Sequence, residues 1–387
     1  MKKLLVALLV AALAIPAAAF GADTIKIGFN IPLTGDIPKV GEMSKNAAEM
    51  LKEKINGAGG FEVGGKKYQL EFVYVDNEAK GESAQSAALQ LIEGAKVLAM
   101  VGPQGSGRAI PAGEVANNNK TVMVSAWSTN PKTTLDRPYV FRACFLDDFQ
   151  GPVAAKFAAG QLKAKKAAVL FAVDQDYCKG ISEFFKQSFE EINGPGSVVA
   201  YETFTTKDVD FSAQLTKIIK AKPDVIFVPQ YYQEVPLILK QARDLGYKGP
   251  VLGSDSWESA DLMKLCGDDC KGQYYVNHYA AAGAKGETKK FIDEFNAKYK
   301  EIPDAVAALT WDATNMVLAA IKKMGSLSGD LAKDRTAIRD SMSTMRDFDG
   351  ITGKMSFNGK TGDPIKCAVI IKINDKGEFT FHESVCP

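Results

Sequence analysis

Residues 101–131, VGPQGSGRAIPAGEVANNNKTVMVSAWSTNP, carry the pattern that decides the fold. A short apolar strand at 97–101 runs into a Gly-rich turn, and a helix is predicted to begin at Ser106. A second apolar strand at 121–125 ends in a hydroxyl-rich turn at 127–131. Two neighbouring strand ends would thus present backbone N–H groups, hydroxyls and a helix N-terminus, which together suit a small anion such as a carboxylate. The same residues would also serve in two ordinary strand-to-helix turns.

Short apolar strands alternate with amphipathic helices along most of the chain, and this alternation predicts the fold class. Strands are expected at 24–33, 68–75, 97–101, 121–125, 167–173, 198–204, 225–229 and 251–252, and helices at 43–55, 83–95, 106–119, 149–163, 181–192, 211–221 and 234–245. The alternation indicates an α/β fold of parallel sheets that helices cover on both faces. The elements form two series of similar plan. We therefore expect two doubly wound, Rossmann-like lobes with a ligand cleft between them, at the carboxyl ends of the strands.

The N-terminal residues predict export from the cytoplasm. Lys2 and Lys3 are followed by an apolar run from Leu4 to Ile15 that is too short to span a bilayer, and small residues follow this run. Residues 1–22 therefore read as a secretory signal peptide. We expect a periplasmic protein that is soluble once this leader is removed.

Charge and composition argue against some classes of partner. The chain is 46% hydrophobic and 24% charged, which is ordinary for a globular protein with a full core. Its formal net charge is +1, and removal of a leader that carries two lysines and no acidic residue would bring it to about −1. We therefore expect neither nucleic acid nor an anionic membrane as a partner.

All six cysteines follow the predicted leader, and an even number in an exported protein favours disulfides. One pair would be closed by a short turn, a second would face across a hairpin that turns at 374–377, and the third consists of the two cysteines that remain. The expected pairs are Cys266–Cys270, Cys367–Cys386 and Cys144–Cys178. No metal site is expected, because the chain has only two histidines and neither adjoins a tight cysteine pair.

The two predicted lobes differ in the polar groups at their strand ends. The first offers the hydroxyls and backbone amides of 102–107 and 125–129, which suit an anion. In the second, Asp255 follows the strand at 251–252 and suits a cation. A zwitterion would therefore fit between the lobes.

Several short segments resemble, in order and spacing, the type I periplasmic solute-binding proteins of ABC transporters, the group that includes the leucine/isoleucine/valine-binding proteins. The resemblance covers essentially the whole mature chain. The matching segments are 25–35, 56–60, 100–103 with Ser106, 125–131, 150–151, 174–177, 208–212 and 241–246.

This resemblance implies a ligand site. Ser106 would bind the ligand carboxylate through its hydroxyl, and the Ser128 backbone and Thr129 would contact the carboxylate and the ammonium group. Two tyrosines would close over the ligand. Asp255 would accept the α-ammonium group, at a position where the branched-chain binders commonly have Glu. The implied binding residues are Ser106, Ser128, Thr129, Tyr177, Tyr231 and Asp255.

Each of these residues could instead have a purely structural role. Ser106 could only cap a helix, and 129–131 could only form a turn. Both tyrosines could be core residues with a satisfied hydroxyl. Asp255 could cap a helix at 259–265.

The sequence departs from the resemblance at the side-chain end of the implied site. Val40 and the segment around Val306 lack aromatic residues that relatives have, whereas Trp127 and Trp257 are additions. Val40, Trp127 and Trp257 are therefore possible pocket residues. Arg108, another addition, is expected to be a solvated helix residue or an interlobe salt-bridge partner. No special role is expected for the histidines, His278 and His382.

The resemblance implies the substrate-binding component of an ABC importer. It would capture a small amino acid, branched-chain or similar aliphatic, by hinge closure and deliver it to an inner-membrane permease, as a monomer without a cofactor. The expected lobes are 24–143 plus 279–350 and 144–278 plus 351–387.

Three alternatives to this function remain open. The same fold could bind a small carboxylate or amide that is not an amino acid, or it could serve as a ligand sensor. An exported enzyme is disfavoured, because the Gly-rich turn matches neither G-x-G-x-x-G nor G-x-x-x-x-G-K-[ST] and no nucleophile elbow occurs.

Overall fold

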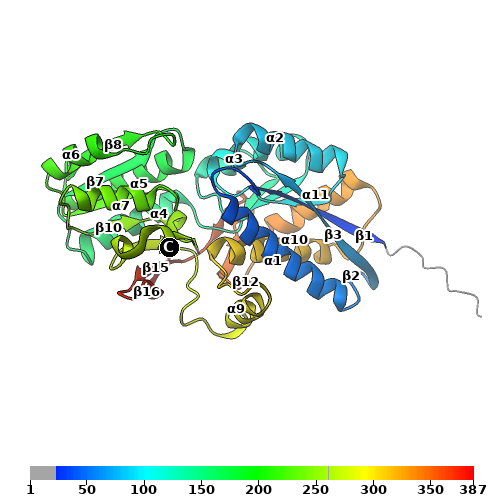
Figure 1. Ribbon diagram of the computed structural model, residues 1–387. Coiled ribbons are helices and arrows are strands. Elements are labelled where there is room, and N and C mark those ends of the chain that lie inside the picture. The colour runs from blue at the N-terminus through cyan, green and yellow to red at the C-terminus, as the bar shows by residue number, and fades with distance from the viewer. Residues whose placement is uncertain (1–22, 260) are drawn as a thin grey trace, which may run out of the picture.

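The computed structural model describes residues 23–259 and 261–387, and the predicted signal peptide at 1–22 lies outside this range. It has two α/β lobes side by side, each built on its own sheet (Figure 1). The predicted fold class is thereby confirmed. None of the helices among the described residues is long and apolar enough to cross a membrane.

The first lobe is built on a six-stranded sheet with the order β2-β3-β1-β4-β5-β6, in which all neighbours but β2 and β3 run parallel. Its strands are β1 (Thr24–Ile31), β2 (Phe61–Val63), β3 (Lys66–Asp76), β4 (Ala99–Val101), β5 (Val122–Ser125) and β6 (Val140–Arg142). The helices on this side of the molecule are α1 (Pro38–Gly57), α2 (Gly81–Leu89), α3 (Ser106–Asn118), α9 (Gly286–Tyr299), α10 (Ala305–Lys323) and α11 (Leu331–Ser343).

The second lobe is built on a seven-stranded sheet with the order β16-β15-β11-β10-β9-β7-β8, in which β15 pairs antiparallel with both β11 and β16. Its strands are β7 (Ala167–Ala172), β8 (Val198–Phe204), β9 (Val225–Val228), β10 (Val251–Gly253), β11 (Tyr274–Asn277), β15 (Ala368–Ile373) and β16 (Phe379–Val385). Its helices are α4 (Asp147–Gly160), α5 (Asp176–Asn193), α6 (Ser212–Lys220), α7 (Val235–Asp244) and α8 (Leu262–Cys266).

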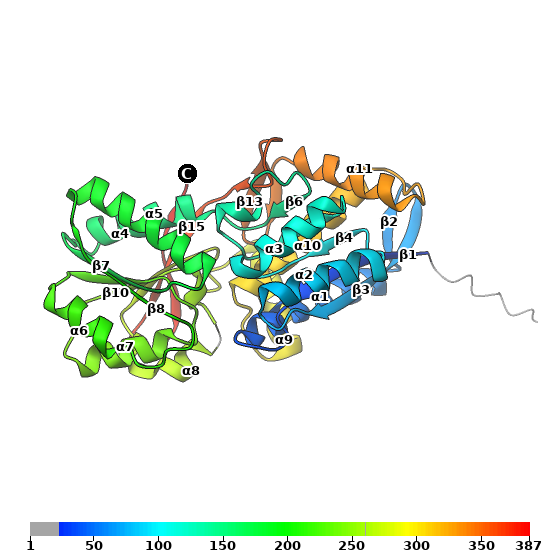
Figure 2. The same ribbon diagram turned by 90° about the horizontal axis from the view of Figure 1, so that it is seen from above.

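A third, small sheet completes the first lobe near the junction. It consists of β12 (Phe348–Gly350), β13 (Gly353–Phe357) and β14 (Pro364–Ile365). The backbone N–H of Arg142 donates to the Gly362 carbonyl at 3.0 Å, and the rings of Phe141 and Phe357 lie 5.5 Å apart. In Figure 2 the chain crosses between the lobes on its way from β13 in the first lobe to β15 in the second.

The central strands are buried because helices cover both faces of each sheet. Every residue of β5, β7, β9 and β10 is buried, as expected for parallel strands with near-continuous apolar sequence. Helix α5 shows how the covering layer is attached. Its residues Ile181, Phe185 and Phe189 recur every fourth position on one face, and Phe185 stacks on Phe227 of β9 at 4.2 Å.

Two of the three predicted disulfides are confirmed and the third is wrong. Cys266 bonds to Cys270 and Cys367 to Cys386. The Cys144–Cys178 pair does not form, and both residues are buried free thiols. Cys144 follows β6 and its thiol donates to the Ser128 carbonyl at 3.3 Å, whereas Cys178 lies in the first turn of α5.

Candidate functional site

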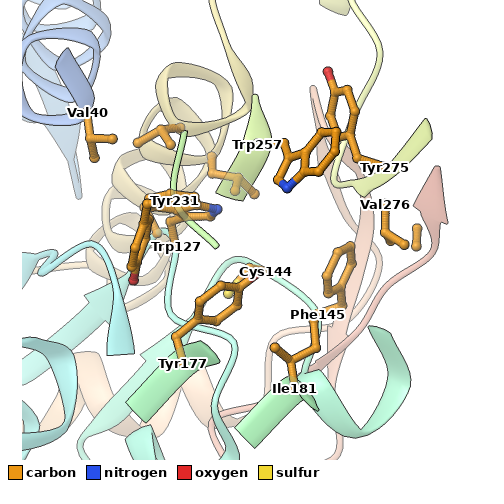
Figure 3. Close-up of a cluster of buried hydrophobic side chains, with 14 of the residues drawn as sticks. Val40, Trp127, Cys144, Phe145, Tyr177, Ile181, Tyr231, Trp257, Tyr275 and Val276 are labelled. Carbon is orange, nitrogen blue, oxygen red and sulfur yellow. The ribbon is translucent and has the colours of Figure 1, made fainter. Parts of the chain in front are cut away.

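The predicted binding residues converge where the two lobes meet, beyond the carboxyl ends of β4, β5, β7, β9 and β10. A narrow cavity lies there, too tight in this structure to hold a water molecule. Figure 3 shows Trp127, Tyr177 and Tyr231 converging from separate segments, while Trp257 lies apart beside Tyr275. The lining residues are Gly105, Trp127, Thr129, Tyr177, Tyr231 and Asp255.

The first lobe presents hydroxyls beside the N-terminus of α3. The Ser106 hydroxyl oxygen accepts hydrogen bonds from the Ser128 hydroxyl at 3.1 Å and from the Asn130 backbone N–H at 3.3 Å. A hydroxyl has one donor and two acceptor sites, so these two bonds leave the Ser106 hydrogen for another oxygen. The Thr129 hydroxyl, which lines the cavity, is buried and has no partner among the described residues.

A buried arginine fixes the loop that carries these hydroxyls. Arg142, fully buried at the end of β6, donates to the Ser128 carbonyl at 2.5 Å and to the Asn130 carbonyl at 3.1 Å. Its Nε also pairs with Asp363 at 2.7 Å, and its second terminal nitrogen donates to Thr134 at 2.8 Å. The loop is therefore held from behind by one guanidinium group.

The second lobe presents one carboxylate, that of Asp255, which is almost fully buried. Its Oδ1 accepts from the Tyr177 hydroxyl at 2.5 Å and from Gln150 at 2.8 Å. Its Oδ2 lies 2.9 Å from Nε2 of His278. A carboxylate has about four acceptor sites, so these three neighbours leave room for one further donor on Oδ2.

His278 connects Asp255 to the segments that join the lobes. It follows β11, its ring stacks on Phe145 at 3.8 Å, and Phe145 lies just after β6. Burial lowers the pKa of His278, against the opposing effect of Asp255. A neutral ring that donates from Nε2 leaves Nδ1 as an acceptor, and Nδ1 has no partner in the described part of the chain. The sequence analysis gave His278 no role, whereas the structure buries it against Asp255.

A second buried carboxyl lies near Asp255. Asp147 opens α4, and neither of its carboxyl oxygens has a partner among residues 23–259 and 261–387. Burial raises its pKa well above the usual range; the nearby Thr129 hydroxyl opposes the rise, and the charge of Asp255 adds to it. The neutral form of Asp147 is thereby favoured, and of these two residues only Asp255 lines the cavity.

The structural alternatives can now be judged by position. Asp255 does not cap a helix, because α8 begins at Leu262 and its carboxylate bonds only to side chains. Ser106 is not the cap of α3, since Gly105 holds that position. Tyr177 and Tyr231 are buried with bonded hydroxyls, as core residues would be, yet both also line the cavity.

Arg108 differs from expectation. It is buried rather than solvated, and it forms no salt bridge within the described ranges. Instead it donates to the carbonyls of Gln104 and Ala79, at 3.1 and 3.2 Å, and to the Tyr231 hydroxyl at 3.3 Å. Because Tyr231 belongs to the second lobe, this last bond links the lobes.

The proposed pocket residues separate into two groups. Trp127 lines the cavity, and its ring meets that of Tyr231 edge-on at 5.8 Å. Trp257 is fully buried in the second lobe, where its indole N–H donates to the Val228 carbonyl at 2.8 Å. Val40 on α1 and Val306 on α10 are buried and do not line the cavity.

Sequence reasoning missed four residues at this site, namely Arg142, Gln150, Asp147 and His278. Gln150 lay within a matching segment but received no role. No sequence signal pointed to the others, because the partners of Arg142 and His278 are defined only by the fold.

Comparison with known proteins identifies relatives along nearly the whole chain. A family model described as periplasmic binding protein matches residues 24–378. The Leu/Ile/Val-binding protein BraC3 of Rhizobium johnstonii is 32% identical over 364 residues, which are 93% of this chain and 94% of that protein. A leucine-, isoleucine-, valine-, threonine- and alanine-binding protein of Pseudomonas aeruginosa is 30% identical over 345 residues, 88% of each chain.

Solved structures also include relatives that match nearly the whole chain. The leucine-binding protein LivK of Thermotoga maritima is 33% identical with a TM-score of 0.85, covering 94% of this chain and 99% of its own. LivJ of Streptococcus pneumoniae, solved in complex with isoleucine, is 32% identical with a TM-score of 0.85, covering 94% and 100%. A benzoate complex from R. palustris, 23% identical with a TM-score of 0.81 and covering 94% and 97%, shares the fold.

Proposed function

Because this chain belongs to the periplasmic binding protein family, we propose that it is the substrate-binding component of an ABC importer that captures a small aliphatic amino acid, branched-chain or similar. One observation carries this proposal. The interlobe cavity has hydroxyls and a helix N-terminus on one side and a single carboxylate, Asp255, on the other. The named relatives that bind such amino acids support the same ligand class.

The first lobe would hold the ligand carboxylate. The free hydrogen of Ser106, the Thr129 hydroxyl and the positive end of α3 are donors that a carboxylate can use without a counter-charge. The backbone of Ser128 would contact the ligand from the same loop, in which Arg142 holds the Ser128 and Asn130 carbonyls in position.

The second lobe would hold the ammonium group. The remaining acceptor site on Asp255 suits one N–H donor, and the ion pair would be buried with the carboxylate already oriented by three neighbours. Tyr177 and Tyr231 would cover the ligand from the same side.

Ligand contacts from both lobes would favour the closed state over an open one. In the structure the lobes already contact each other, since Asn130 donates to the Asp176 carbonyl at 2.9 Å and Arg108 donates to Tyr231. We place the crossings between the lobes at 143–146, 278–285 and near Lys366. The last lies beyond the predicted boundary at 350, because β13 and β14 belong to the sheet that contacts β6.

The family consists of solute-binding proteins, and this function requires no chemical step on the ligand. The ligand would be captured in the periplasm and released to a membrane permease, with the binding protein acting as a monomer. Export by the predicted leader at 1–22 belongs to the same proposal.

Isothermal titration calorimetry would test the zwitterion site. An aliphatic amino acid should bind, and the carboxylic acid of the same skeleton without the amino group should bind at least about 100-fold more weakly, as expected for loss of one partner from a buried ion pair. Equal affinity for the simple carboxylate would refute the proposal and indicate an organic acid as ligand. Mass spectrometry of the recovered ligand should show it unchanged.

A further inference from the structure

Arg108 is a buried cation without an acidic partner. Its side chain is only 4% exposed, and it forms no salt bridge within residues 23–259 and 261–387. Its guanidinium nitrogens donate instead to neutral oxygens, namely the carbonyls of Gln104 and Ala79 and the hydroxyl of Tyr231. A buried charge costs free energy unless an opposite charge lies close to it. Within the described chain, only neutral groups compensate the charge of Arg108.

Tyr231 connects this charge to the end of the cavity that faces α3. Its hydroxyl oxygen accepts from Arg108 at 3.3 Å, and the Arg108 guanidinium lies 5.5 Å from the centre of its ring. A Cβ atom added to Gly105, which caps α3, would lie 3.0 Å from the Tyr231 hydroxyl and would overlap the Arg108 guanidinium. Both groups therefore lie beside the N-terminus of α3, where the ligand carboxylate is proposed to bind.

The Tyr231 hydroxyl still has a hydrogen to donate. Its oxygen accepts from Arg108, and its own hydrogen has no acceptor in the part of the chain that the structure describes. Tyr231 and Gly105 both line the cavity. A carboxylate at the N-terminus of α3 would accept this hydrogen, and a hydroxyl that is itself bonded to a cation is a stronger donor.

We propose that Arg108 supplies the buried counter-charge of the ligand carboxylate, acting through the Tyr231 hydroxyl, which donates to that carboxylate. This inference rests on the proposed function, because it presumes an amino acid whose carboxylate lies at the N-terminus of α3. Arg108 belongs to the first lobe and Tyr231 to the second, so the two bonds that join Arg108 to the ligand form together only when the lobes are closed. Arg108 is thus a positioning residue that couples carboxylate recognition to closure.

Calorimetric titration of the mature protein with L-leucine, L-isoleucine, L-valine and L-alanine would test this role. For the amino acid that binds the wild-type protein most tightly, Arg108→Gln and Tyr231→Phe should each weaken binding at least about tenfold, as expected for loss of a hydrogen bond to a charged group. The double variant should bind no more than about threefold more weakly than the more affected single variant, because both substitutions break the same chain of bonds.

Arg335→Gln provides the matched control. Arg335 is a buried arginine on α11 that donates to the backbone carbonyls of Ile92 and Val97, and it does not line the cavity. Its loss should lower the melting temperature of the ligand-free protein, as Arg108→Gln should, and leave affinity within about threefold of wild type. If Arg108→Gln does not fold by circular dichroism, Arg108→Met, which removes the charge without burying an amide, takes its place with the same expected result.

The outcomes separate the two proposals. If an amino acid binds the wild-type protein and the folded Arg108 variant binds it within about threefold as tightly, Arg108 is not the counter-charge and the proposed function stands. Fully additive losses in the double variant would overturn the connection through Tyr231, and an equal loss of affinity in Arg335→Gln would show that Arg108 acts only through stability. Failure of all four amino acids to bind would overturn the proposed function and this inference with it.

Discussion

Replacing Asp255 with asparagine removes the charge that the proposed ammonium contact needs while preserving the size of the side chain. The carboxylate accepts from Tyr177, Gln150 and His278 at 2.5 to 2.9 Å. An asparagine would offer one oxygen and would point an NH₂ group at one of these neighbours. The substitution should therefore weaken ligand binding and also destabilise the protein without ligand.

The two effects differ in size. A buried ammonium that loses its carboxylate partner costs ~3–5 kcal/mol, which at ~1.4 kcal/mol per decade corresponds to a loss of roughly 10²- to 10³-fold or more in affinity. In the ligand-free protein, the cost is that of one buried donor left without an acceptor, ~1–3 kcal/mol. Tyr177→Phe should weaken binding less than Asp255→Asn, because it removes one bond to the carboxylate and keeps the charge.

The assay combines calorimetric affinity with the melting temperature of the ligand-free protein. Glu258→Gln is the matched control, since Glu258 is a buried carboxyl of the same lobe that does not line the cavity. Its affinity should stay within about threefold of wild type, a difference under ~1 kcal/mol. If Asp255→Asn lowers the melting temperature but binds ligand as the control does, Asp255 is not the ammonium partner.

Three further predictions follow from the buried groups. Unfolding without reductant should expose two alkylatable thiols, those of Cys144 and Cys178. The native protein should resist alkylation, because burial raises the pKa of Cys144 to about 12 and that of Cys178 well above its usual range. If the unfolded protein has no alkylatable thiol, the third disulfide does form. Arg142→Gln should lower stability by at least ~2 kcal/mol, because charge-assisted bonds are lost, and it should also weaken ligand binding. Arg137→Gln removes bonds to the same loop from a more exposed position, so it should lower stability and affinity less. Burial raises the pKa of Glu258 to about 8, so the folded protein keeps a proton that the unfolded chain releases near its usual pKa of 4.5. Relative to Glu258→Gln, wild-type stability should therefore fall as pH rises from about 5 to about 8. If the melting temperatures of the two proteins change in parallel across this window, Glu258 does not titrate as stated.

The sequence predicted those parts of the fold that depend on local patterns. The strand at 198–204 and the hairpin that turns at 374–377 were recovered, because apolar alternation and turn residues are readable within about ten positions. The helices from 286 to 343 were not assigned, although α10 is largely buried and apolar. A helix that is apolar on most faces lacks the contrast between faces on which the periodic signal depends.

The sequence predicted residues that line the candidate site, but it did not predict the hydrogen bonds and ion pair that hold them. Thr129, Tyr177, Tyr231 and Asp255 line one cavity, as their strand-end positions and the family resemblance indicated, although their binding roles stay predictions. The bond from His278 to Asp255 and that from Arg142 to Asp363 were not foreseen, because strand pairing far along the chain brings these residues together. The Cys144–Cys178 pairing was wrong for a related reason, since counting cysteines gives no distance between them.

A crystal structure of the complex with the amino acid that binds most tightly would test the central claim most directly. It should place the ligand between the lobes, with its carboxylate at Ser106 and Thr129 and its ammonium group on Asp255. A reversed ligand would contradict the account. So would an amino acid bound instead in the cavity beside Glu258 and Ile302.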